Sequence, residues 1–549
     1  MEVRTTWVEP PERAQGLDHL GTHAPCIDLY TRLLPGITNV TDRARYYSLY
    51  PWFVWAFDQR YRSVDSEKFE QLFRRADCLL TWIAERHSQR TGQQTDWHAV
   101  GGIGRQKLVP ALNKLDAGEA LRLSDYATRE NNGTRYFQNR LGGLGQYYIG
   151  TLQDLRILDV SERGWIKYTK ERGAVLAEAV ERRVDSAKFF KVLEGDRVSL
   201  KLLDELEPFC FCRLPHSSEE HAQLADLLFE RALSSDEPGG QRRQTLAFAL
   251  AMVDASAGKW RVPVTLEHFQ CASYGRSFGS GRLWKVPAPL EATASAWALY
   301  VRNDLLSIAA QAVFAVGLKI IDQHEQEGLR FATGHDFETW ITGSALAKRV
   351  AKHFAGKSFG AITHGARSTL APIDGWDLPD HEWACSRSIL EAFKAGSDEA
   401  VLVHSLRILV ALAARPTTKE AYQASPFEAG FLDNYPINLQ SFTELAAGEW
   451  SELSIPRLLG WLMNRWGIEV HLSVALRKLR YNPQATFRVR PAERGLEIID
   501  DVPPPTRTNP RVGQGLQMLR DLEAIVDGPE GSSLTAFGRR MLEEVLNGR

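Results

Sequence analysis

Residues 151–159 read TLQDLRILD and residues 519–527 read LRDLEAIVD, so one Asp-Leu pattern occurs at the end of two expected helices. Each copy continues into a short segment, 160–168 or 528–534, and then into a threonine-led amphipathic stretch that contains a glycine. A helix, a tight hairpin and a closing helix in this order are typical of a winged helix. The sequence therefore predicts two winged-helix-like modules.

Composition limits the classes of protein to which the chain can belong. It has 549 residues and a formal net charge of −2, so several domains are expected and polyanion binding needs a local patch. Six scattered cysteines do not form the disulfide framework of a secreted protein, and the N-terminus lacks a signal-peptide core. The longest apolar run, residues 308–321, is too short and too polar to span a bilayer. We expect a cytoplasmic protein without membrane contact.

Helical periodicity dominates the chain, and no alternation of strands with helices predicts a doubly wound sheet. Helices are expected at 69–86, 292–325, 382–395 and 397–414, among others. Residues 1–30, with their prolines and glycines, are expected to form an irregular arm. The predicted fold is mainly α and multidomain, with helical bundles, the two winged-helix-like modules and a small β-hairpin unit.

The β-hairpin unit follows two helices expected at 455–466 and 469–479. Residues 486–490 and 496–499 alternate as two strands around a turn, which predicts the hairpin. The predicted domains are an N-terminal helical domain ending in the first module (1–184), a helical middle domain (185–300), a further helical domain (301–450), the basic helix–hairpin unit (451–500) and the second module (507–549).

The helix–hairpin unit carries the strongest local charge. Between residues 457 and 494 eight Lys and Arg face only Glu469 and Glu493, an excess of six positive charges. Such a cluster can grip phosphates, with binding that weakens steeply as salt rises. It can also pair with an acidic protein partner, or with acidic surface of the chain itself. The residues expected to contact nucleic acid here are Arg465, Arg477, Lys478, Arg480, Arg488 and Arg490.

The two modules offer a second candidate surface. In the first module, residues 146–154 would form a recognition helix, and Arg163 and Lys167 would lie on the wing and contact nucleic acid. The wing of the second module, residues 528–531, is short and acidic, which favours contact with protein. Alternatively, both modules serve only for packing.

Metal-binding and catalytic motifs are weak. Cys210, Cys212, His216 and His221 invite a zinc interpretation, but their spacing is tighter than in the usual structural sites, so we expect no metal and no cofactor. No nucleophile motif is present, and the acidic–histidine cluster at residues 335–338 does not make a catalytic site by itself. A non-enzyme is therefore favoured, with an enzyme whose active site is assembled from distant segments as an alternative.

Three segments carry a resemblance to a known group. They are residues 33–47 (LLPGITNVTDRARYY), Arg74-Arg75-Ala76, and 471–479 (HLSVALRKL) with 486–488 (TFR). Over about a fifth of the chain they resemble poorly characterised large helical proteins of bacterial phage-defence islands. A more remote similarity is to kleisin-like subunits of bacterial condensin-type complexes, which carry a winged helix near each end.

The resemblance implies a role in defence against phages or mobile elements, beside an ATPase or nuclease. We therefore expect a non-catalytic component that binds nucleic acid, most simply DNA, or that scaffolds a defence complex. The first alternative is a kleisin-like adaptor that docks on an ATPase. The second is a nuclease or other enzyme with a dispersed site.

Overall fold

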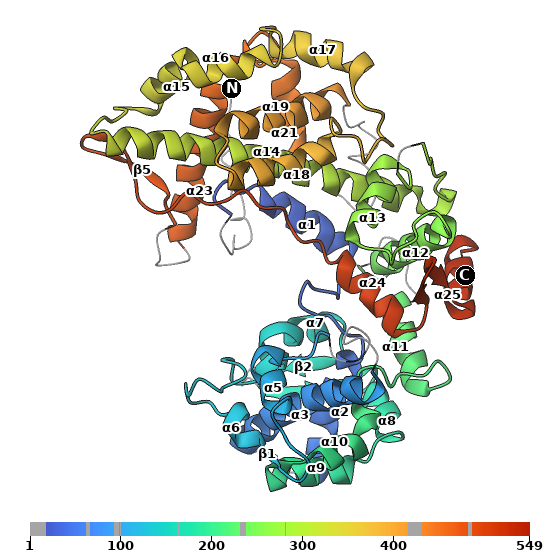
Figure 1. The fold of residues 1–549 in the computed structure, drawn as a ribbon. Helices are drawn as coiled ribbons and strands as arrows, with labels where there is room; N and C mark the ends of the chain where they lie inside the picture. Colours follow the sequence, from blue (N-terminus) through green and yellow to red (C-terminus); the bar gives the residue numbers. More distant parts are fainter. Residues whose placement is uncertain are drawn as a thin grey trace, which may run out of the picture. The chain divides into compact units, whose positions relative to one another are not determined.

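The computed structural model describes residues 18–61, 66–92, 98, 100–161, 165–230, 238–279, 281–415, 431–480 and 486–548. This described part is mainly helical, and its named strands form short antiparallel pairs (Figure 1). The predicted mainly α fold class is therefore confirmed, whereas the winged-helix identity of the modules stays a prediction.

The chain divides into two compact units, and each unit combines segments that are distant in sequence. Unit 1 consists of residues 1–33 and 267–510, and unit 2 consists of residues 34–266 and 511–549. The expected segments 1–184 and 185–300 each span a boundary between these units, and the five-segment division stays a prediction.

Unit 1 is built around one long buried helix. Its elements are α1 (His23–Leu33), α13 (Leu266–Gln270), the π-helix η3 (Cys271–Gly275), η4 (Ala288–Leu290), α14 (Glu291–Gln326), α15 (Gly334–Gly343), α16 (Ala345–Lys352), α17 (Phe359–Thr369), α18 (Glu382–Lys394), α19 (Asp398–Ala414), α21 (Leu439–Ala447), α22 (Ile455–Trp461), the π-helix η5 (Leu462–Glu469), α23 (Val470–Leu479), β5 (Val489–Ala492) and β6 (Gly495–Ile498). The long helix is α14, which is apolar on nearly every side and packs against α1, α18, α19 and η5 (Figure 1).

The segment Ala288–Gln326 is long and apolar enough to cross a membrane by length and composition, and 89% of its most apolar window is buried inside the protein. Burial in the core of unit 1 accounts for this hydrophobicity.

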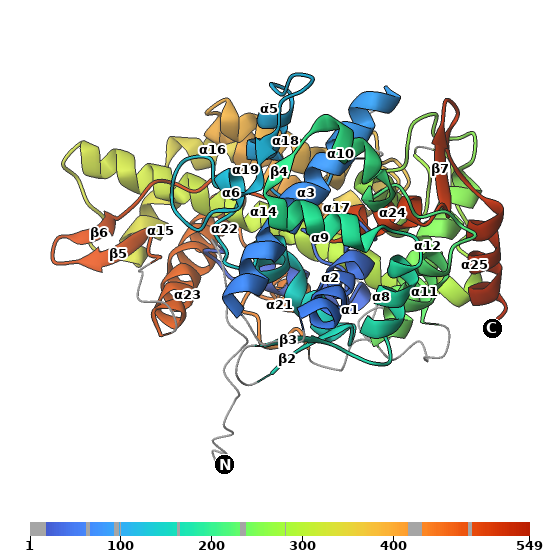
Figure 2. The same cartoon turned by 90° about the horizontal axis from the view of Figure 1, so that it is seen from below.

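The predicted hairpin of the basic unit is present as β5 and β6. It lies at the same end of α14 as α15 (Figure 2). The backbone N–H of Leu496 donates to the carbonyl oxygen of Phe331 at 2.8 Å. A Cβ on Gly495, whose φ is +114°, would lie 2.2 Å from that oxygen, so this contact needs glycine.

The expected irregular arm is wrong for residues 23–30, because α1 begins at His23. The Asp18 carboxylate accepts hydrogen bonds from the backbone N–H groups of Thr22 and His23 at 3.0 and 2.9 Å, so it caps this helix. Tyr30 then packs edge-on against Tyr300 of α14, with ring centroids 5.9 Å apart. Packing on α14 stabilises a helix that local composition disfavours. Residues 1–17 lie outside the described part.

Unit 2 contains both helix–hairpin–helix modules. Its elements are α2 (Tyr46–Tyr61), α3 (Ser66–Thr91), α5 (Arg105–Leu112), β1 (Leu121–Arg122), α6 (Leu123–Ala127), the π-helix η1 (Leu144–Tyr148), α7 (Ile149–Asp154), β2 (Leu158–Val160), β3 (Ile166–Tyr168), α8 (Gly173–Glu181), α9 (Ser186–Gly195), β4 (Arg197–Val198), α10 (Leu200–Glu205), η2 (Glu207–Phe209), α11 (Glu219–Phe229), α12 (Pro238–Ser256), α24 (Val512–Asp521), β7 (Ile525–Gly528), β8 (Gly531–Leu534) and α25 (Ala536–Leu546).

A buried carboxylate organises the centre of unit 2. Asp77 on α3 accepts hydrogen bonds from the hydroxyls of Tyr50 and Tyr136 and from the backbone N–H of Gly143, at 2.8–3.0 Å. Burial raises the pKa of Asp77 to about 6, although these hydrogen bonds act to lower it. Tyr50 of α2 and Tyr136 thus have a polar partner in the buried interior of unit 2.

The two modules share the same turn between helix and hairpin. The chain is left-handed at Arg156 in the first module (φ 55°) and at Glu523 in the second (φ 53°). The hydroxyl of Thr169 donates to the carbonyl oxygen of Arg156 at 2.6 Å. The hydroxyl of Thr535 donates to the carbonyl oxygen of Glu523, also at 2.6 Å. The similarity seen in the sequence is therefore also a similarity of local structure.

Each module also needs one glycine where its closing helix meets the hairpin. A Cβ on Gly173 would lie 2.3 Å from the carbonyl oxygen of Ile157, and a Cβ on Gly538 would lie 2.1 Å from that of Ala524. Real Cβ atoms do not approach so closely, so any larger residue would push the closing helix away from its hairpin.

A buried ion pair joins the C-terminal module to the N-terminal part of unit 2. Arg43 makes two contacts of 2.9 Å with the carboxylate of Asp521, and both side chains are 1% exposed. The same carboxylate accepts the backbone N–H of Ala44 at 2.9 Å. Residues 478 positions apart are thereby held together.

We predict that Asp521→Asn lowers the free energy of unfolding of unit 2 by about 3–5 kcal/mol, because Arg43 then keeps a buried charge without a countercharge. Urea denaturation, with hydrogen exchange of peptides from 511–549, measures this change. The control Arg539→Ala removes an exposed ion pair with Asp254 of the same unit and should cost less than about 1 kcal/mol. If both variants lowered the free energy of unfolding by the same amount, the buried pair would stabilise unit 2 no more than an exposed pair does.

Candidate nucleic-acid interface and candidate metal ligands

Three of the predicted phosphate contacts in the basic unit are paired with carboxylates. Arg465 lies 3.1 Å from Glu469 one turn later in η5, and Arg490 lies 3.2 Å from Glu497, its neighbour across the hairpin. Arg488 contacts Asp500 at 2.5 Å, and its side chain is only 14% exposed. Glu469 is already included in the charge excess counted in the sequence, so the two further carboxylates, Glu497 and Asp500, reduce that excess from six to four.

Lys478 is buried and turned inwards. Its Nζ donates to the carbonyl oxygen of Asp18 at 2.5 Å, and burial lowers the pKa of its ammonium group. Arg477 and Arg480, by contrast, are exposed at the end of α23, and no carboxylate contacts them among the residues that the structure describes. Trp466, a candidate for base stacking, is 5% exposed and packs on Trp450 instead.

The predicted surface of the first module is only partly described. Lys167 is exposed on β3, opposite Asp159 of β2. Arg163 lies outside the described residues. The expected recognition helix is divided between η1 and α7.

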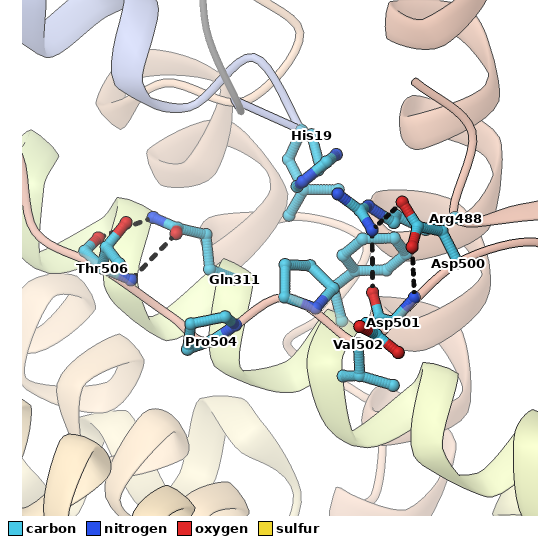
Figure 3. Close-up of a pocket in the computed structure, with 11 residues that line it drawn as sticks. His19, Gln311, Arg488, Asp500, Asp501, Val502, Pro504 and Thr506 are labelled. Atoms are coloured by element: carbon cyan, nitrogen blue, oxygen red, sulfur yellow. Dashed lines mark hydrogen bonds and ion pairs between the residues drawn. The ribbon is translucent and has the colours of Figure 1, made fainter. Parts of the chain in front are cut away.

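Arg488 faces a pocket of about 390 Å³ in unit 1 (Figure 3). The pocket is also lined by His19, Gln311, Asp500 and Asp501. Arg488 binds the Asp500 carboxylate and also donates to the carbonyl oxygen of Asp501 at 3.0 Å. Its guanidinium group therefore has partners on the protein and is held away from open solvent.

Two neutral histidines lie beside this pocket. The ring of His471 accepts the backbone N–H of Arg488 on Nε2 at 2.8 Å, so the proton sits on Nδ1, which donates to the carbonyl oxygen of His19 at 3.0 Å. Burial lowers the pKa of His471 to about 4. Burial, followed by the charges of Arg488, His471 and Lys478, also lowers the pKa of His19 to about 4, against a smaller opposite effect of Asp500.

The sequence interpretation missed a second basic surface, on α16 and α17. Residues 339–373 contain no Asp or Glu but five Lys and Arg. Ser344 and Ser358 cap the two helices by accepting backbone N–H groups, and the helices form part of the outer layer of unit 1 (Figure 1). The absence of carboxylates over this stretch was the signal that could have revealed it.

Most of these cations face solvent. Arg349 pairs with Glu399 of α19 at 2.7 Å. Lys348, Lys352, Lys357 and Arg367 are exposed, and no carboxylate forms an ion pair with them in the described part of the chain. Lys348 and Lys352 are one turn apart and therefore lie on the same face of α16.

The histidines that lie beside Cys210 and Cys212 in the structure are not the two that the sequence suggested as zinc ligands. Cys210 and Cys212 meet His87 and His98, and all four ligand atoms lie within 4.8 Å of one another. His221 instead contacts the carbonyl oxygen of Leu522 through Nε2 at 2.8 Å.

His216 is turned elsewhere as well, since its Nε2 lies 3.1 Å from the Arg540 guanidinium. Its spacing from the cysteines therefore carried no information about a metal site. The two histidines that do meet the cysteines are more than a hundred residues away from them in the sequence.

We predict that unit 1 loses stability as the pH falls from about 6.5 towards 4. The unfolded chain binds protons on both histidines near pH 6.5, whereas folded His19 and His471 resist protonation until about pH 4. At about pH 5 the loss should be on the order of 1–2 kcal/mol for each histidine. Denaturant titrations across this range measure it.

His19→Gln should make this pH dependence shallower. His335→Gln, at an exposed position of α15, is the matched control and should leave it unchanged. An identical slope in the wild type and in His19→Gln would contradict the assignment.

Comparisons of the chain with models of protein families, with curated proteins and with solved structures found no match. The geometry and charges described above are therefore the structural basis for any inference about function.

Proposed function

We propose that this chain is a non-catalytic nucleic-acid-binding or scaffolding component of a bacterial defence complex in the cytoplasm. The observation that carries the proposal is the carboxylate-free segment 339–373, in which Lys348, Lys352, Lys357 and Arg367 are exposed without ion-pair partners among the described residues. The defence context is supported by the resemblance to proteins of phage-defence islands.

Electrostatics favours this segment as the phosphate-binding surface. A cation already paired with a carboxylate must give up that partner before it binds a phosphate, so it contributes little net free energy. Lys348, Lys352 and Lys357 have no such partner to give up. Because the whole chain carries a net charge of only −2, a local surface of this kind can attract DNA without opposition from a strongly negative molecule.

The cations predicted from the sequence form a smaller second surface. Arg477 and Arg480 remain exposed on α23, in the same unit as α16 and α17. Lys167 on the first module would add a contact from unit 2 if that module acts as a winged helix. Arg465, Arg488 and Arg490 would contribute only after their ion pairs open.

A protein-binding adaptor is the second candidate. Its supporting observation is the second module, whose hairpin carries the acidic residues Asp527 and Glu530 and exposes 51% of Val526. Because Arg520 pairs with Asp527 at 2.7 Å, the exposed Val526 and Glu530 are the features of this hairpin that suit a protein partner better than a phosphate backbone. Recovery of a partner from native lysate after nuclease treatment would favour this role.

We predict that the triple variant Lys348→Glu, Lys352→Glu, Lys357→Glu weakens binding to generic duplex DNA. The affinity should fall more than tenfold at low salt, and the slope of log affinity against log salt should become shallower by roughly 1 for each phosphate that the protein no longer neutralises. Fluorescence anisotropy at several salt concentrations measures both quantities.

The matched control Lys114→Glu, Lys191→Glu, Lys201→Glu makes the same change in net charge at exposed positions of unit 2 and should leave both quantities nearly unchanged. A third variant, Arg477→Glu with Arg480→Glu, tests the surface predicted from the sequence. If the α16 variant binds DNA with wild-type affinity and salt slope, the proposed surface is wrong.

A further inference from the structure

Four metal-ligating side chains converge inside unit 2 from three separate segments. His87 lies in the last turns of α3, His98 follows that helix, and Cys210 and Cys212 follow η2. His87, His98 and Cys210 are 5%, 2% and 0% exposed, and Cys212 is half-buried. Such a gathering of soft and borderline ligands in a protein interior is typical of metal sites.

The four ligand atoms lie within 4.8 Å of one another, close to the spacing of one shared tetrahedral centre. Four atoms bound at about 2.0–2.3 Å to a tetrahedral zinc ion are separated by roughly 3.3–3.8 Å from one another. The two sulfur atoms are 3.5 Å apart, and Nδ1 of His87 is 3.4 Å from Sγ of Cys212. Nδ1 of His98 lies 3.1 Å from Sγ of Cys212 and 3.9 Å from Sγ of Cys210.

Both imidazole rings present Nδ1 to this centre, and their other nitrogens have partners on the protein. Nε2 of His87 lies 3.4 Å from the Glu207 carboxylate, and Nε2 of His98 lies 3.3 Å from the Thr91 hydroxyl. A metal-bound histidine usually donates its outer N–H to a carboxylate or another acceptor, which orients the ring and strengthens it as a ligand. The cluster therefore has the outer partners of a built metal site as well as its ligands.

The backbone of the cluster is held by buried arginines. Nη1 of Arg45 donates to the carbonyl oxygens of Pro208 and Cys210 at 2.7 and 2.5 Å. Nη1 of Arg43 donates to the carbonyl oxygen of His98 at 3.3 Å. Both arginines are neutralised by their own carboxylates, Asp521 and Glu220, so they do not oppose a bound cation with unpaired positive charge.

We propose that His87, His98, Cys210 and Cys212 bind one zinc ion that stabilises unit 2. Four protein ligands complete the tetrahedron and leave no position for a substrate, which indicates a structural site and not a catalytic one. Two thiolates balance the charge of the ion. The ion connects the end of α3 to the segment after η2, and it requires no nucleic acid, so this proposal is independent of the proposed function.

The first test is the metal content of the full-length protein purified without chelators. Mass spectrometry should find one zinc per chain. Replacement by cobalt should give the intense visible bands of tetrahedral Co²⁺ and a thiolate-to-cobalt charge-transfer band in the near ultraviolet. A chain that carries no zinc and takes up no cobalt would overturn the proposal, as would a bound cobalt without the thiolate band.

The second test uses variants of single ligands. Cys212→Ser and His98→Ala should reduce zinc content or affinity by at least tenfold, and a strong chelator should lower the thermal midpoint of the wild type but not of these variants. Cys78→Ser is the matched control, because Cys78 is a buried cysteine on α3, the helix of His87, and takes no part in the cluster. It should keep one zinc per chain.

The measurements on the wild type decide the question even if a ligand variant does not fold. Full zinc content in both ligand variants would place the ion elsewhere and overturn the assignment. A disulfide between Cys210 and Cys212 in freshly purified protein, found by peptide mapping with zinc absent, would do so as well.

Discussion

The bidentate ion pair between Arg43 and Asp521 is the constraint on which the architecture of unit 2 depends. The two side chains come from opposite ends of the chain and are both almost completely buried. Removing either one would leave a charge in a medium of low polarity, so the C-terminal module cannot leave the unit without a large cost in free energy. Such a pair adds less to net stability than an apolar contact of the same size would, and its effect here is to specify which segments belong together.

Other buried arginines extend the same principle through unit 2. Arg45 binds Glu220, and Arg74 donates to main-chain carbonyl oxygens around residues 127–139. Arg43 and Arg45 also fix the backbone at His98 and Cys210, so the proposed zinc site is an extension of this network. The donors of these arginines satisfy carboxylates on α11 and α24 and main-chain carbonyl oxygens near residues 127 and 208.

Local periodicity predicted much of the fold. The helices expected at 69–86 and 292–325 are observed as α3 and α14, and the expected hairpin is observed as β5 and β6, because these patterns depend on neighbours within one or two turns. Helix α1 was missed because α14 stabilises it from a distance. The proposed ligands His87 and His98 were missed for the same reason, since Cys210 lies more than a hundred residues away and spacing along the chain says nothing about that approach.

The charge of the basic unit shows why a count of cations is a poor guide to a phosphate-binding surface. A carboxylate that is close in sequence, or opposite across a hairpin, forms an ion pair with an arginine at little cost in conformational entropy. Glu469 pairs with Arg465 in this way, and Glu497 pairs with Arg490. Residues 339–373 contain no carboxylate, so an ion pair there needs a distant element, and among the described residues Glu399 of α19 provides one for Arg349. The segment without carboxylates therefore keeps a larger fraction of its cations free of ion pairs than the segment with more Lys and Arg does. Among the described residues, the segment around α16 and α17 keeps four of its five Lys and Arg exposed without an ion pair, whereas residues 457–494 keep four of eight.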